Sequence, residues 1–146
     1  MHRYTSAQGI NFIKHWEGFS NVPYLCSGNF LTIGYGHKLN KAKTLTKINE
    51  VDAEKLLAKD LYKAEIAVLR YINVPLLKYQ FDALVSFTFN LGNAALQRST
   101  LRQKINYEAH TEAADEFLKW IYVSGVAIRG LVLRRQHERE LYLRYV

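Results

Sequence analysis

Residues 19–37 are the part of this sequence whose pattern is typical of β-strands, and helical periodicity lies on both sides of them. Short apolar and β-branched stretches flank a Ser-Gly-Asn triplet at 27–29, and these residue types favour a tight turn. Gly34 and Gly36 follow, which indicates backbone that another group approaches closely. A small hairpin enclosed by helices confines the chain to the α+β class, mostly α.

The rest of the sequence predicts helices. Thr5 and Gln8 form a capping-box pattern that opens a first helix, which ends at Glu17. Apolar residues at steps of three and four predict a long helix over about 49–73, which stops before Pro75 because the residue preceding a proline is pushed out of the helical region. Further helices are predicted at 79–91, around 94–105, from 111 and at about 131–144. The helix at 79–91 is apolar on every side, so it should be the buried centre of the fold.

The predicted order of elements fits one domain over residues 1–146, which is long enough to bury a core without metals or disulfides. A hairpin lobe covers about 17–48, and the helix at about 49–73 connects it to a helical lobe. That larger lobe covers about 74–146 and also takes in the N-terminal helix.

Composition limits the partners of the chain. Its 20 basic and 13 acidic residues give a net charge of +7, which predicts attraction to an anionic partner. Nucleic acid and a bacterial wall with its carboxylates and phosphates both meet that description. The single cysteine excludes an internal disulfide, and the absence of one fits a reducing compartment.

No apolar run approaches the roughly 20 residues needed to cross a bilayer, and the N-terminal sequence lacks an apolar signal core. We therefore expect cytoplasmic synthesis without a signal peptide and no stable membrane insertion. If the target lies beyond the membrane, another component must release the protein.

Glu17, Cys26 and Thr32 place a carboxylic acid, a thiol and a hydroxyl around the predicted hairpin. Cleavage of a glycosidic bond needs a proton donor that faces a group able to hold water or attack carbon. Glu17 ends a helix and follows Trp16, and both the helix dipole and an apolar neighbour favour a protonated carboxyl group. Cys26 could attack the sugar directly or hold a water molecule together with Thr32. The alternative interpretations, without a catalytic role, are a glutamate on the surface, an inert buried cysteine and a threonine that only packs in the strand.

The sequence resembles phage-type lysozymes, the endolysins of glycoside hydrolase family 24, in three separated motifs. In that family a Glu is followed at this separation by an Asp or a Cys and then by a Thr. The similarity runs from about Thr5 to the last predicted helix. The motifs are the spacing of Glu17, Cys26 and Thr32 with a Gly-Tyr-Gly-His run behind it, the segment 80–92 with residues 99–101, and a C-terminal set of Trp120, Gly125, Gly130, Leu131, Arg134, Arg135 and Glu138.

The resemblance implies a lysozyme-like fold with a cleft between the two lobes. It also implies hydrolysis of the β-1,4 bond between N-acetylmuramic acid and N-acetylglucosamine in bacterial peptidoglycan, causing cell lysis. Glu17 would be the acid, while Cys26 and Thr32 would manage the attacking water. Arg134 would orient Glu17, and we expect His37 to be a hydrogen-bonded brace. The residues expected to hold the sugar chain are Gly34, Tyr35, Leu39, Phe89 and Asn90.

Three other functions stay open at the level of sequence. The same cleft could belong to a lytic transglycosylase, which leaves an anhydro-muramic end. A non-enzymatic, cationic wall-binding antimicrobial protein could act through the arginine-rich last helix. A nucleic-acid binder is disfavoured because no recognised motif is present.

We expect no cofactor and no metal, since the histidines lack ligand spacing with cysteines or carboxylates. We also expect a monomer whose partner is peptidoglycan, not nucleic acid, and whose release the resemblance assigns to a holin-type partner.

Overall fold

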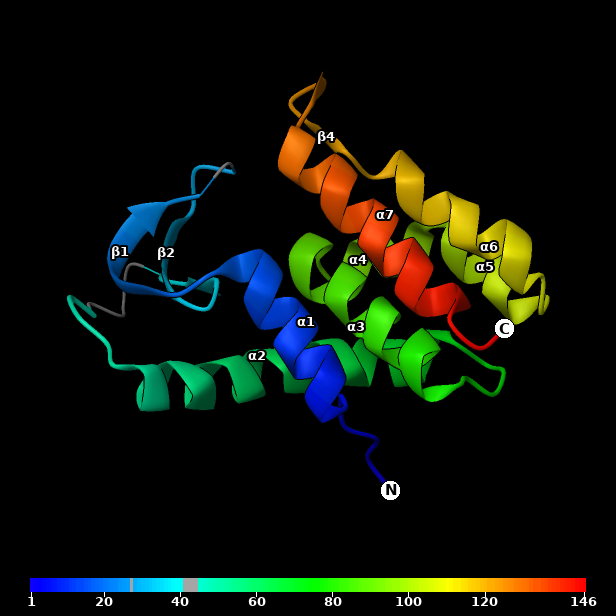
Figure 1. The fold of residues 1–146 in the computed structure, drawn as a ribbon, viewed down its shortest axis with the longest axis horizontal. Helices are drawn as coiled ribbons and strands as arrows, with labels where there is room; N and C mark the ends of the chain where they lie inside the picture. Colours follow the sequence, from blue (N-terminus) through cyan, green and yellow to red (C-terminus); the bar gives the residue numbers. More distant parts are fainter. Residues whose placement is uncertain (27, 41–44) are drawn as a thin grey trace.

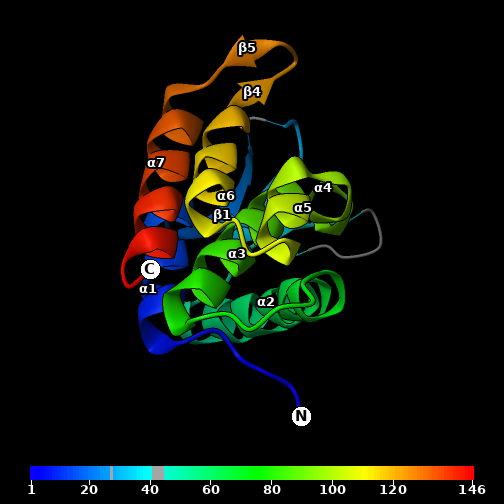
Figure 2. The same ribbon diagram turned by 90° about the vertical axis from the view of Figure 1, so that its right-hand side faces the viewer.

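A computed structural model describes residues 1–26, 28–40 and 45–146 of the chain. Figures 1 and 2 show a small antiparallel sheet at one end and a group of helices at the other, with the long helix α2 (Glu50–Tyr71) running beneath both. Most of the chain is helical, so the predicted α+β class with a helical majority is confirmed. Within the described residues, no helix combines the length and the apolar character needed to span a membrane.

Helix α1 (Ala7–Glu17) begins one residue later than the capping-box pattern predicted. The side chain of Ser6 accepts a hydrogen bond from the backbone N–H of Gly9 and is therefore the N-cap. Thr5 has another role: its backbone N–H and its hydroxyl both donate to Oε2 of Glu65 on α2, at 2.7 and 2.6 Å. The prediction for Thr5 was wrong because a buried acid from another helix binds the hydroxyl that would have capped α1.

The sheet contains three antiparallel strands in the order β1 (Ser20–Leu25), β2 (Leu31–Gly34) and β3 (His37–Lys38). The predicted turn between the first two strands begins at Ser27, which lies outside the described residues. Around it, the Cys26 N–H donates to the Phe30 carbonyl at 3.0 Å, and the chain reverses through a left-handed Asn29.

The register of the sheet decides which side chains face the same way. Thr32 lies opposite Tyr24 in β1 and opposite Lys38 in β3. Side chains that lie directly opposite each other in adjacent strands share a face, and the next residue along each strand points to the other face. Ile33 and His37, which also pair, therefore belong to the opposite face, which packs on α2.

Helix α2 follows its prediction closely. Asn49 caps it by accepting from the Asp52 N–H at 2.8 Å, and the helix ends before Ile72. It contacts β2 and β3 near its start and α3 (Lys78–Leu91) and α4 (Asn93–Arg98) further along. A single helix therefore supports both ends of the molecule.

Helix α3 is the buried centre that its all-round apolar pattern predicted. Residues 80–88 are all buried, and Gly92 ends the helix with a φ of +98°. The predicted helix at 94–105 is two helices, because Ser99 leaves the helical conformation and caps the second of them. The remaining helical elements are α5 (Thr100–Asn106), α6 (His110–Glu116), the 3-10 turn η1 (Phe117–Lys119) and α7 (Arg129–Leu143).

A second hairpin, which the sequence analysis did not predict, joins η1 to α7. Its strands are β4 (Tyr122–Val123) and β5 (Val126–Ala127). Ser124 and Gly125 connect them with φ values of +50° and +80°. A two-residue turn with positive φ at both positions matches the twist of a hairpin, and Gly in the second place favours it.

Candidate active site

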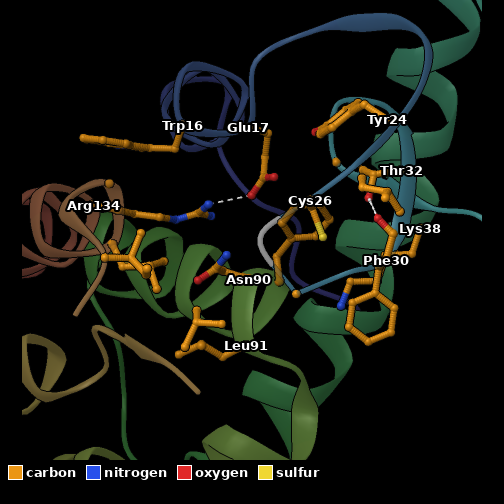
Figure 3. Close-up of a pocket in the computed structure, with 18 of the residues that line it drawn as sticks. Trp16, Glu17, Tyr24, Cys26, Phe30, Thr32, Lys38, Asn90, Leu91 and Arg134 are labelled. Atoms are coloured by element: carbon orange, nitrogen blue, oxygen red, sulfur yellow. Dashed lines mark hydrogen bonds and ion pairs between the residues drawn. The ribbon is translucent and has the colours of Figure 1, made fainter. Parts of the chain in front are cut away.

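A groove of about 630 Å³ lies among the sheet, the end of α1, the end of α3, the β4–β5 hairpin and the start of α7. Of the predicted catalytic and supporting residues, Glu17, Cys26, Thr32 and Arg134 line it. Figure 3 shows the side chains of Glu17 and Cys26 extending toward the same space, with Asn90 below them. The fold thus brings together an acid, a thiol and a hydroxyl that the sequence separates.

Glu17 is placed by the end of α1 and held by the last helix. The chain leaves α1 through Gly18, whose φ of +68° turns it toward the sheet. Nη1 of Arg134 donates to Oε2 of Glu17 at 2.5 Å, and the Glu17 side chain is only 15% exposed. The other carboxylate oxygen, Oε1, lies against Gly36 on the groove wall.

Arg134 is itself fixed by a buried polar network. Its Nη2 donates to the backbone carbonyl and the hydroxyl of Ser86, each at 3.2 Å, and its Nε lies 3.3 Å from Glu138. Glu138 also accepts from the Ser86 hydroxyl at 2.6 Å and from Arg135 at 2.7 Å. Because every member is buried and bonded, Arg134 presents its remaining donor to Glu17 in one orientation.

Cys26 and Thr32 enter the groove from the same face of the sheet. The Thr32 side chain is almost fully buried, and its hydroxyl donates to the Phe30 carbonyl at 2.9 Å. Burial raises the pKa of the Cys26 thiol. The backbone hydrogen bonds of Gly28 and Phe30, the adjacent Thr32 hydroxyl and, least of these, the charge of Lys38 together outweigh that effect. The pKa of Cys26 therefore lies below its ordinary value, which increases the fraction of reactive thiolate.

The pKa of Tyr24 depends on burial and on the charges of both Glu17 and Cys26. Burial raises the pKa of the Tyr24 hydroxyl, and the negative charges of Glu17 and Cys26 raise it further. The phenol therefore stays protonated and can donate a hydrogen bond into the groove. Sequence reasoning missed Tyr24, although counting back along β1 in steps of two from Cys26 reaches it.

Two of the five predicted sugar-binding residues, Phe89 and Asn90 at the end of α3, line the groove. The side-chain oxygen of Asn90 accepts a hydrogen bond from Arg135. The amide NH₂ of Asn90 is then the part that can donate to a sugar oxygen.

Gly34, Tyr35 and Leu39 are not among the described residues that line the groove, and their sugar-binding role stays a prediction. Gly34 packs against α2, where an added Cβ would lie 3.2 Å from Cβ of Ala53. Tyr35 is 8% exposed, within the hydrophobic core, and Leu39 packs at the edge of that core. Leu39 follows the groove-facing Lys38 in sequence, whereas Gly34 ends β2 with a φ of +67° and packs on α2.

His37 lies on the opposite face of β3 from Lys38. Its Nδ1 is 2.8 Å from a carboxylate oxygen of Asp60 on α2. It borders a second cavity of about 360 Å³, which shares Gly36, Lys38 and Phe89 with the groove. This position fits the predicted hydrogen-bonded brace between sheet and helix, and the role stays a prediction.

Further residues that line the groove were not predicted. Lys38 and Phe30 share the face of Thr32, so strand alternation could have identified them. The opposite wall comes from the unpredicted β4–β5 hairpin and the start of α7, through Tyr122, Val123, Ile128, Gly130 and Leu131. The Ser-Gly pair in the middle of β4–β5 was the available signal for this wall. In the described ranges, no group of three potential ligands could hold a metal ion.

Gly36 gives a direct test of the position of Glu17. In Gly36→Ala the new Cβ would overlap Oε1 of Glu17 and lie 2.9 Å from its Cδ, while the φ of +75° strains any side chain. Gly18→Ala is the matched control, since it has a φ of +68° but open space around its Cβ. We expect both variants to lose about 1–2 kcal/mol of stability. Only Gly36→Ala should also lose ~10²-fold in the rate at which a bacterial wall suspension clears. Equal clearing rates in the two variants would contradict the assigned contact.

The fold and the groove between sheet and helices place the chain in the lysozyme-like class of proteins. The family described as phage lysozyme matches residues 14–138, and the chain belongs to that family. An endolysin of Bacillus phage B103 is 42% identical over 140 residues, which are 94% of this chain and 53% of that protein. The chain therefore spans about half the length of this relative.

Two solved structures match along nearly their whole length. The endolysin from Escherichia coli O157:H7 phage FAHEc1 is 35% identical with a TM-score of 0.89, covering 100% of this chain and 97% of that one. The muramidase domain of SpmX from Asticaccaulis excentricus is 33% identical with a TM-score of 0.87, covering 98% and 99%.

Proposed function

We propose that this chain is an endolysin that hydrolyses the β-1,4 bond between N-acetylmuramic acid and N-acetylglucosamine in bacterial peptidoglycan. One observation carries the proposal: a carboxyl group, held by Arg134 through one oxygen, lies in a groove across from Cys26 and Thr32. Family membership supports the reaction class. We further propose that residues 1–146 act as one catalytic domain, with hairpin and helical lobes on the two sides of the groove.

Glu17 is the proposed general acid. Arg134 fixes Oε2, so Oε1 is the oxygen that can carry a proton to the leaving oxygen of the sugar. As the glycosidic bond breaks, positive charge develops on the sugar ring. The ionised Glu17 that remains helps to stabilise that charge from one side of the groove.

Cys26 and Thr32 are proposed to complete the reaction in one of two ways. In the first, they position a water molecule that attacks the anomeric carbon, the thiolate accepts its proton, and the configuration inverts. In the second, the Cys26 sulfur attacks the anomeric carbon and a water molecule later breaks the carbon–sulfur bond, so the configuration is retained. The lowered pKa of Cys26 serves either route.

Phe89 and Asn90 are the proposed sugar-binding residues at the end of α3. The net charge of +7 would attract the protein to the anionic wall, an attraction that salt weakens. We propose a monomer that is made inside the bacterium, reaches the wall after a holin-type partner opens the membrane, and needs no nucleic acid, cofactor or metal.

Product analysis tests this function. Digested peptidoglycan should yield fragments with a reducing muramic end, heavier by one water than the anhydro ends that a transglycosylase leaves. NMR of the first product formed assigns the anomer and so separates inversion from retention. Anhydro ends would instead identify a lytic transglycosylase. Killing that survives both heating and loss of Glu17 would identify a non-enzymatic, cationic wall-binding protein.

A further inference from the structure

Lys38 and Cys26 share the groove-facing side of the sheet. Lys38 lies opposite Thr32, which lies opposite Tyr24, and Cys26 follows Tyr24 by two residues. Residues two apart in a strand point the same way, and the Cys26 N–H bonds to the carbonyl of Phe30. The three strands therefore bring an ammonium group and a sulfur to one wall, and both residues line the groove (Figure 3).

The Lys38 ammonium group is held near that wall. Its Nζ lies 4.3 Å from the centre of the Phe30 ring, and Phe30 belongs to the turn that closes over Cys26. Among the ion pairs of the described residues, none involves Lys38, whereas Lys14 pairs with Glu54 and Lys104 with Glu116. The charge of Lys38 is therefore not neutralised by an acid there.

The other charged or titratable groups lining the groove have been assigned partners or roles. Glu17 from α1 is paired with Arg134 from α7, so these two charges largely cancel. Tyr24 from β1 keeps its proton, and Tyr122 comes from the far wall. Among the described residues that line the groove, Lys38 is thus the positive charge without an ion-pair partner, and it lies on the sheet side with Cys26.

We propose that Lys38 is a positioning residue that favours the negatively charged form of the Cys26 sulfur, so that more thiolate faces the sugar. This proposal rests on the proposed function and extends it. If the sulfur is the nucleophile, it bonds to the anomeric carbon while the leaving oxygen takes the proton of Glu17. Water then displaces the sulfur and returns a proton to Glu17. If the sulfur is the base, it takes the proton of the attacking water and later loses it to solvent. Lys38 contributes to both routes because both begin from the charged sulfur. The pKa of Cys26 is lowered mainly by hydrogen bonds and, to a smaller extent, by the charge of Lys38.

The test follows from the single cysteine, because alkylation by iodoacetamide reports Cys26 alone. The alkylation rate rises with the thiolate fraction, so its midpoint pH follows the pKa of the thiol. In Lys38→Met the midpoint pH of alkylation should rise by on the order of 0.5 pH unit, as expected for the loss of one charge several ångströms away in a solvent-exposed groove. Lys38→Arg should restore the midpoint of the parent. Lys59→Met, which removes one exposed positive charge from α2, is the control and should change nothing.

Activity must follow the same shift. The acidic limb of the pH profile for wall clearing should move upward with the alkylation midpoint in Lys38→Met and stay in place in Lys38→Arg. If Lys38→Met lowers activity while its midpoint matches that of Lys59→Met, Lys38 is only a sugar contact and the proposal is wrong.

Two further measurements keep the test decisive. If Lys38→Met does not fold, the parent protein is titrated at low and high salt. Added salt should raise its alkylation midpoint, because salt screens exposed charges. A midpoint that does not move would overturn the proposal. If the parent protein releases no reducing ends from peptidoglycan, the proposed function is wrong. The thiol titration still measures the effect of Lys38 on Cys26 in that case.

Discussion

Replacing Glu17 by glutamine is expected to lower the rate of wall clearing by at least ~10²-fold while the protein stays folded. Glutamine can still accept the hydrogen bond from Arg134 but has no proton to deliver to the leaving oxygen. The measurement is the loss of turbidity of a peptidoglycan suspension, with the thermal midpoint of unfolding as the check on folding.

Glu54→Gln is the matched control for this substitution. Glu54 pairs with Lys14 on the surface and its side chain is 52% exposed, so the change should alter neither clearing nor stability appreciably. Undiminished clearing by Glu17→Gln would remove Glu17 from the mechanism, whatever the control shows.

Replacing Glu138 by alanine is expected to cost about 3–5 kcal/mol of unfolding free energy, the usual result of removing one partner from a buried ion pair. The Glu138 side chain is fully buried between Arg134 and Arg135, whose side chains are 5% and 0% exposed. Without the carboxylate, two guanidinium groups keep their burial but lose their shared counter-charge. Urea unfolding at neutral pH measures the loss, which should appear as a lower midpoint at an unchanged slope.

Glu140→Ala provides the comparison on the same helix. Glu140 is exposed, so its removal should change the unfolding free energy by no more than about 0.5 kcal/mol. If the two alanine variants unfold at the same urea concentration, the buried network does not stabilise α7 as described. Because Arg134 also orients Glu17, Glu138→Ala should lose activity at temperatures where it is still folded.

Local patterns were enough to predict most of the fold. The hairpin, the cap of α2 at Asn49 and the buried α3 each depend on nearby residues, and each was found where predicted. One error comes from a distant contact, and the others come from short-range features that no periodic pattern marks. Thr5 binds Glu65 instead of capping α1, and Ser99 interrupts a helical stretch. The β4–β5 hairpin has only two residues in each strand, too few for a periodic signal.

The residues of the candidate site, too, were predicted only in part. The spacing of Glu17, Cys26 and Thr32 pointed to three side chains that do share the groove. The predicted sugar contacts at Gly34, Tyr35 and Leu39 stay predictions, and strand alternation would have added Lys38, which lies opposite Thr32 and lines the groove. The buried ion network around Glu138 involves residues from α3 and α7. It was not predicted, because no pattern in the sequence indicates which helices pack against each other.

The contact between Arg134 and Glu17 joins residues 117 positions apart. The proposed acid therefore belongs to α1, and the group that orients it belongs to α7. A nascent polypeptide whose translation has not reached α7 carries the acid without its guanidinium partner and without one wall of the groove. The proposed activity would then require that α7 has been made and has packed, and fragments truncated before α7 would lack it.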